Sequence, residues 1–70
     1  MFIKVTAIDE VDEGKDTTYI NTEHISSIKW NQDRSTTEVL LTVGALLDVT
    51  ETPDEILEMI INKRIQRNIK

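Results

Sequence analysis

His24 is the only histidine in the chain and the side chain best suited to acid–base chemistry near neutral pH. A catalytic histidine needs a nucleophile within reach and a third group that orients its ring. Ser26 and Ser27 follow closely, but neither lies in a Gly-x-Ser-x-Gly turn, which would expose a nucleophilic serine. We therefore interpret His24 as a turn residue, exposed or hydrogen-bonded to the backbone, and predict that the chain is not an enzyme.

Carboxylates crowd the segment 9–16, which is the best candidate for cation binding: Asp9, Glu10, Asp12, Glu13 and Asp16. A calcium-binding EF-hand loop carries its ligands at alternate positions between two helices. Here the spacing is irregular and the flanking segments have strand patterns. We expect a solvated loop that protects adjacent strand edges, and a weak divalent-cation site stays open as the alternative. Gly14 and Gly44 stand alone, so no phosphate loop and no cofactor are predicted.

The composition predicts one small cytoplasmic domain over residues 1–70. The chain has no cysteine, which excludes disulfides and thiolate zinc sites and fits a reducing compartment. The apolar start at Met1 to Lys4 is too short for a signal peptide, and no segment approaches the roughly 20 apolar residues of a membrane span.

Charge is distributed unevenly along the chain. The net charge is −5, yet no acid follows Glu58, and four bases lie beyond it: Lys63, Arg64, Arg67 and Lys70. Acids at the start of a helix and bases at its end compensate the helix dipole, which accounts for this pattern without a function. The alternatives are that the bases meet an acidic protein surface or that they bind nucleic acid. The acidic total makes nucleic-acid binding the weaker alternative.

Apolar and β-branched residues alternate in five segments before residue 50, which predicts strands. The expected segments are 2–8, 17–20, 25–30, 37–43 and 45–49, with Val39, Leu41 and Val43 directed inward. A short turn is expected at 21–24, where Asn21 can bond its own downstream backbone. Short connections predict an antiparallel meander over residues 2–50.

Thr52-Pro53-Asp54-Glu55 predicts the start of one helix, over residues 53–68. Threonine can cap the helix, proline suits its first position, and Glu55 can reach back to Thr52 to close a capping box. The fold class predicted is α+β: a five-stranded antiparallel, strongly curved and barrel-like meander with one C-terminal helix. The helix is longer than the strands and should extend beyond the sheet. Ile65 and Ile69 then lie in the overhang, either frayed and exposed or packed on a second copy.

Only three aromatic residues are present, too few for a single-strand nucleic-acid platform. Tyr19 and Trp30 are expected to pack in the core or partly at the surface, and Trp30, beside the polar hairpin 31–36, is the better candidate for an interface anchor. Two candidate interaction surfaces follow, one in the hairpin and one on the helix. Their residues are Trp30, Arg34, Ile61, Lys63, Arg64, Ile65, Arg67 and Ile69.

An ordered set of motifs resembles the FlbD/SwrD family of small flagellar-associated bacterial proteins. It covers about residues 2–61 and comprises Ile3-Lys4-Val5-Thr6, Tyr19-Ile20-Asn21, His24-Ile25, Ile28, Val39, Leu41, Gly44, Val49, Glu51-Thr52-Pro53-Asp54-Glu55-Ile56 and Ile60. The loop at 9–16, the hairpin at 31–36 and the tail after Ile61 are longer than in that family. The resemblance implies a cytoplasmic, non-enzymatic accessory protein associated with motility. We predict a protein-interaction module whose partner is not specified by the sequence, with nucleic-acid binding through the basic helix as the alternative.

Overall fold

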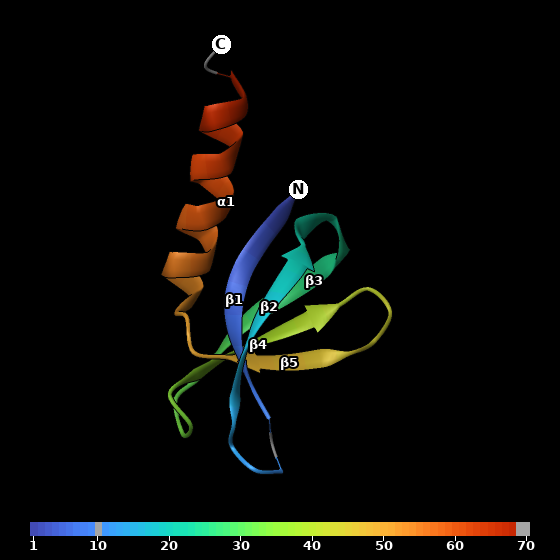
Figure 1. The fold of residues 1–70 in the computed structure, drawn as a ribbon, viewed down its shortest axis with the longest axis vertical. Helices are drawn as coiled ribbons and strands as arrows, with labels where there is room; N and C mark the ends of the chain where they lie inside the picture. The colour runs from blue at the N-terminus through green and yellow to red at the C-terminus, as the bar shows by residue number, and fades with distance from the viewer. Residues whose placement is uncertain (10, 69–70) are drawn as a thin grey trace.

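The computed structural model describes residues 1–9 and 11–68, with side chains as far as residue 65. Five strands precede one α-helix (Figure 1), which confirms the α+β class. The elements are β1 Phe2–Ile8, β2 Lys15–Asn21, the short 3₁₀-helix η1 Thr22–His24, β3 Ile25–Asn31, β4 Thr36–Leu41, β5 Leu46–Val49 and α1 Pro53–Asn68.

All neighbouring strands in the sheet are antiparallel, in the order β2-β1-β5-β4-β3. The β1–β2 hairpin is paired along its full length, from Phe2 opposite Asn21 to Ile8 opposite Lys15. The strands β3, β4 and β5 form a meander. The two parts join where β1 meets β5, and the register there contains the single pair Ala7 and Val49.

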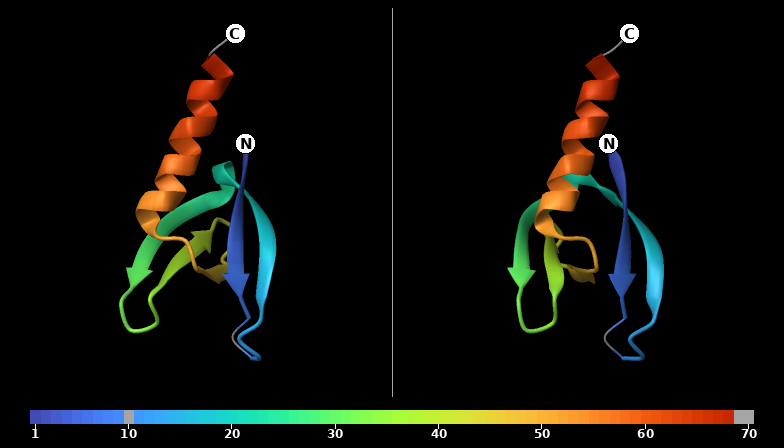
Figure 2. Two further views of the ribbon diagram at one scale, coloured as in Figure 1. Left: turned by 60° about the vertical axis from the view of Figure 1, so that its left-hand side comes forward. Right: turned by 90° about the vertical axis from the view of Figure 1, so that its left-hand side faces the viewer.

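The sheet is open, so the prediction of a strongly curved, barrel-like sheet is wrong. The successive strands β2 and β3 lie at opposite edges instead of pairing (Figure 2). The cause is the η1 turn. The two ends of η1 are bonded to different parts of the sheet. Thr22 N donates to the carbonyl of Met1, just before β1, at 2.8 Å, and Thr42 N, just after β4, donates to the carbonyl of His24 at 2.7 Å.

Polar side chains build the turns between the strands. Asn21 Oδ1 accepts a hydrogen bond from Glu23 N at 3.1 Å, which confirms the predicted Asn turn. In the β1–β2 loop, Asp9 accepts from Val11 N at 2.7 Å and Asp12 accepts from Gly14 N at 2.8 Å. These two carboxylates therefore stabilise the loop itself.

The turn after β4 differs from the prediction. The strand ends at Leu41, and Gly44 adopts a φ of 94°, a left-handed conformation that glycine allows at little cost. Val43 lies in this turn with 83% of its surface exposed, so its inward placement was wrong. The alternation of apolar residues predicted a strand that continues two residues beyond the point where the backbone reverses.

The core lies between one face of the sheet and the first turns of α1. It consists of Ile3, Val5, Ile20, Val39, Val49 and Ile56, with Met59 and Ile60 of the helix packed partly against it. Alternate residues of β1 enter this core, as predicted. Ile56 of α1 is fully buried in this core, and burial of one isoleucine side chain contributes roughly 1.5–3 kcal/mol. Ile56 is therefore the main apolar link between the helix and the sheet.

The predicted capping box opens the helix. Thr52 Oγ1 accepts from Glu55 N at 3.1 Å, and Glu55 Oε1 accepts from Thr52 N at 2.8 Å. The amino-terminal half of α1 packs beside β1 and β3, while its carboxyl half extends past the ends of the strands (Figures 1 and 2). In the described part of the chain, no helix combines the length and the hydropathy that crossing a membrane requires.

Candidate functional site

Three large apolar side chains are exposed along one face of α1. Leu57, Ile61 and Ile65 are 49%, 54% and 50% exposed, and we name them the α1 stripe. Residues four apart lie above one another on a helix, so the three form a continuous row. The row is centred roughly 150° around the helix from the buried face that carries Ile56. The α1 stripe therefore points away from the protein's own core.

Charged side chains divide the helix into two halves around this stripe. Asp54, Glu55 and Glu58 are exposed in the amino-terminal half, and Lys63 and Arg64 are exposed in the carboxyl half. The acids lie near the positive end of the helix dipole, as the sequence predicted. The result is one helix with an acidic half, an apolar row through its middle and a basic half.

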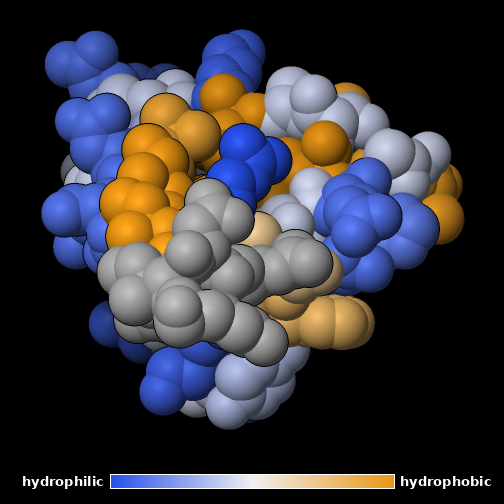
Figure 3. Space-filling view, turned by 90° about the horizontal axis from the view of Figure 1, so that it is seen from above, coloured by the Kyte–Doolittle hydropathy of each residue, from blue (hydrophilic) through white to orange (hydrophobic). Residues whose placement is uncertain are grey.

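The position of the stripe makes it accessible. Figure 3, which looks down on the carboxyl end of the helix, shows apolar atoms at the surface beside α1. Ile61 and Ile65, both predicted interaction residues, belong to the exposed α1 stripe. Ile69 lies outside the described residues, and so does the side chain of Arg67. Lone exposed apolar side chains are ordinary, but an aligned row of them marks a candidate binding surface.

Trp30 belongs to a second surface at the β3–β4 hairpin. It lies opposite Thr37 in the register and is 42% exposed. A hollow of about 200 Å³ beside it is lined by Lys29, Trp30, Asn31, Gln32, Asp33 and Glu38. This hairpin lies at the end of the molecule opposite the carboxyl end of α1 (Figure 1). The structure therefore does not bring the two predicted surfaces together.

Arg34, predicted as an interaction residue in this hairpin, makes an ion pair within the chain. Its Nη1 lies 2.9 Å from Asp48 Oδ2, and the exposed fractions of the two side chains are 41% and 5%. A buried carboxylate requires a partner of opposite charge, and Arg34 supplies it. The contact fixes the hairpin on β5.

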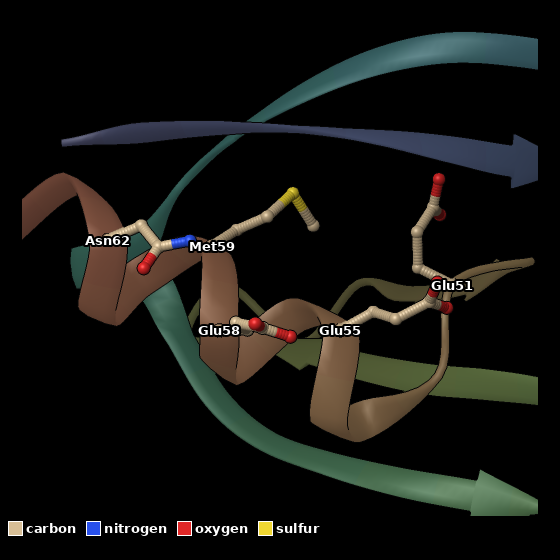
Figure 4. Close-up of a pocket in the computed structure, with 5 residues that line it drawn as sticks. All are labelled: Glu51, Glu55, Glu58, Met59 and Asn62. Atoms are coloured by element: carbon tan, nitrogen blue, oxygen red, sulfur yellow. The ribbon is translucent and has the colours of Figure 1, made fainter.

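A pocket of about 260 Å³ beside α1 is lined by Glu51, Glu55, Glu58, Met59 and Asn62 (Figure 4). Its carboxylates are largely occupied within the protein. Glu51 accepts from Thr6 N at 2.8 Å and from Thr6 Oγ1 at 3.0 Å, and Glu55 caps the helix. In the residues that the structure describes, no group of three or more His, Cys, Asp or Glu side chains is arranged to hold a metal ion.

His24 lies in η1, at the turn where the sequence placed it. Its Nδ1 lies 3.4 Å from Thr42 Oγ1, and its carbonyl accepts from Thr42 N. Ser26 and Ser27 are exposed on β3. The described contacts of His24 thus attach η1 to the turn after β4.

Sequence reasoning did not select two residues that the structure makes important. Leu57 was not among the predicted interaction residues, yet it is the first member of the exposed stripe. The four-residue spacing between Leu57 and Ile61 was the sequence signal that could have identified Leu57 as part of the stripe. The role of Glu51 depends on a contact with a residue 45 positions away, which no local pattern reveals.

Comparisons with models of protein families, with curated proteins and with solved structures found no match.

Proposed function

We propose that this chain is a non-catalytic accessory module of the cytoplasm that binds another protein chain through the α1 stripe. The observation that carries the proposal is the row of Leu57, Ile61 and Ile65, half exposed on a helix that extends beyond its sheet. Helices commonly bind proteins by placing residues at such spacing into a complementary apolar surface.

The arrangement of polar groups supports a binding role over catalysis. The carboxylates of Glu51 and Glu55 are engaged in holding β1 and the helix start, and His24 is in contact with Thr42. The resemblance to the FlbD/SwrD family associates the module with motility. Nucleic-acid binding has less support, because the exposed bases Lys63 and Arg64 share their helix with exposed acids.

The proposal can be tested by photo-crosslinking in the native host. A photoreactive amino acid is placed at Ile61 of the stripe, at Trp30 of the hairpin or at Thr17, an exposed control position on β2. We expect a protein adduct from position 61 that is absent from position 17 and lost when Ile65→Asp is added. An adduct from position 30 alone would show that the hairpin, and not the α1 stripe, is the interface. The absence of an adduct from position 61 would overturn the proposal.

The association with motility needs a separate measurement. Deletion of the gene is expected to reduce swimming in soft agar, and the wild-type chain should restore it. Ile61→Asp should fail to restore swimming although it accumulates to the same level, while Val11→Asp, at a 93% exposed loop position, should succeed. Normal swimming of the deletion strain would refute the motility role and leave the binding surface to the crosslinking test.

A further inference from the structure

We infer that the partner of the α1 stripe is a second copy of this chain, with the two helices antiparallel and Ile61 at the two-fold axis. The inference rests on the proposed function and specifies its partner. It follows from the symmetry of the stripe, from the two charged halves of α1 and from the direction in which the stripe faces.

The apolar row is symmetric about its centre. Leu57 precedes Ile61 by four residues and Ile65 follows it by four. When a second helix is laid antiparallel with the two Ile61 side chains together, each Leu57 meets the partner's Ile65. A two-fold interface requires this kind of self-complementary surface.

The charges on α1 complement a reversed copy of the same helix. Glu58 lies three residues before Ile61 and Arg64 lies three residues after it, and both are exposed. In the antiparallel pair, the acidic half of one helix therefore runs beside the basic half of the other. A parallel pair would align acid with acid and base with base, which opposes association. Antiparallel helix dipoles also attract.

The fold leaves room for the second copy. Leu57, Ile61 and Ile65 are exposed on the side of α1 away from the core, and the carboxyl half of α1 extends past the strands (Figures 1 and 2). We therefore expect both sheets to lie outside the helix pair. Leu57 to Ile65 spans only about 12 Å of helix. A contact of this length is smaller than the standard interface of about 1,600 Å². We therefore expect a reversible dimer whose population depends on concentration.

Sedimentation equilibrium between micromolar and millimolar concentrations tests the association. The wild-type chain is expected to shift from monomer to dimer across this range. Ile61→Asp places two carboxylates at the axis and should raise the dissociation constant by about 100-fold. Val11→Asp adds the same charge far from the stripe and should leave the constant unchanged. Circular dichroism checks that both variants stay folded.

Disulfide trapping tests the orientation, because the natural chain contains no cysteine. Chains carrying Leu57→Cys are mixed with chains carrying Ile65→Cys, and diamide oxidises each close pair of thiols to a disulfide. The antiparallel pair places position 57 beside position 65 of its partner but separates two copies of position 57 by about 12 Å, beyond disulfide reach. We expect the mixed disulfide to dominate, and Val11→Cys to remain monomeric.

Three results would overturn the inference. They are a strict monomer at millimolar concentration, a dissociation constant unaffected by Ile61→Asp, and disulfides between identical positions 57. If the chain is monomeric while position 61 still crosslinks to a different protein in the host, the self-association fails and the proposed binding function stands. If neither dimer nor adduct forms, both fail.

Discussion

The carboxylate of Glu51 accepts hydrogen bonds from both the backbone and the side chain of Thr6, from Thr6 N at 2.8 Å and from Thr6 Oγ1 at 3.0 Å. Thr50 N also donates to the carbonyl of Thr6 at 2.9 Å. These bonds lie where β1 meets β5, a junction with one pair of residues in register. A side chain thus continues the hydrogen bonding that β5 is too short to provide.

Glu51→Ala should destabilise the protein by about 2–3 kcal/mol, because it removes a charged acceptor and leaves Thr6 N without its partner. Glu51→Gln should cost less, since its amide oxygen can still accept from Thr6 N. Urea unfolding measures both. A change below about 0.5 kcal/mol for Glu51→Ala, typical of neutral surface sites, would show that the contact does not hold the junction.

Arg34→Ala should lower the free energy of unfolding by about 1–3 kcal/mol, because it leaves the buried Asp48 carboxylate without its cation. The same substitution should cost much less in an Asp48→Asn background, where no buried charge remains. A double-mutant cycle in urea isolates this coupling. Equal costs in both backgrounds would indicate that Arg34 contributes by packing and not by charge.

Thr52→Ala should cost about 1 kcal/mol, since it removes the acceptor for Glu55 N at the helix start. Thr52→Ser retains the hydroxyl and serves as the matched control. Thermal unfolding followed at 222 nm checks the prediction. If alanine and serine behave alike, the hydroxyl does not cap the helix in solution.

Adjacent helix residues should respond in opposite ways to the same truncation. Ile56 is 0% exposed and Leu57 is 49% exposed. Ile56→Ala should cost about 2–5 kcal/mol through the lost core contacts and the cavity, while Leu57→Ala should cost below about 0.5 kcal/mol at concentrations where the chain is monomeric. Urea unfolding of the two variants measures the contrast. Similar losses would mean that α1 turns a different face toward the sheet than the one that carries Ile56.

The elements that the sequence predicted well are those with local causes. The capping box needs only residues 52–55, and alternation in β1 needs only its neighbours, so both were available without tertiary information. The order of the strands in the sheet, by contrast, could not be predicted from local patterns. Short connections favour pairing of consecutive strands, but η1 is tied to Met1 and Thr42, and these long-range bonds turn β3 away from β2.

The proposed interaction surface could also be predicted only in part from local patterns. Ile61 and Ile65 could be identified because the expected helix was longer than the strands. The exposure of Leu57 depends on which face of α1 lies on the sheet, and the burial of Ile56 in the core sets that face. Arg34 was selected for its position in a polar hairpin, and its buried partner belongs to a distant strand. The interaction roles of Ile61, Ile65, Trp30, Lys63 and Arg64 stay predictions.

The β1–β5 junction also constrains how the molecule folds. The β1–β2 hairpin and the β3–β5 segment close short loops, which form rapidly, whereas Thr6 and Glu51 are separated by 45 residues. Closing this separation costs more chain entropy than closing either of the short-loop parts, so we expect the β1–β2 hairpin and the β3–β5 segment to join late in folding. Because Glu51 immediately precedes the Thr52 cap, the event that completes the sheet also sets the helix in place.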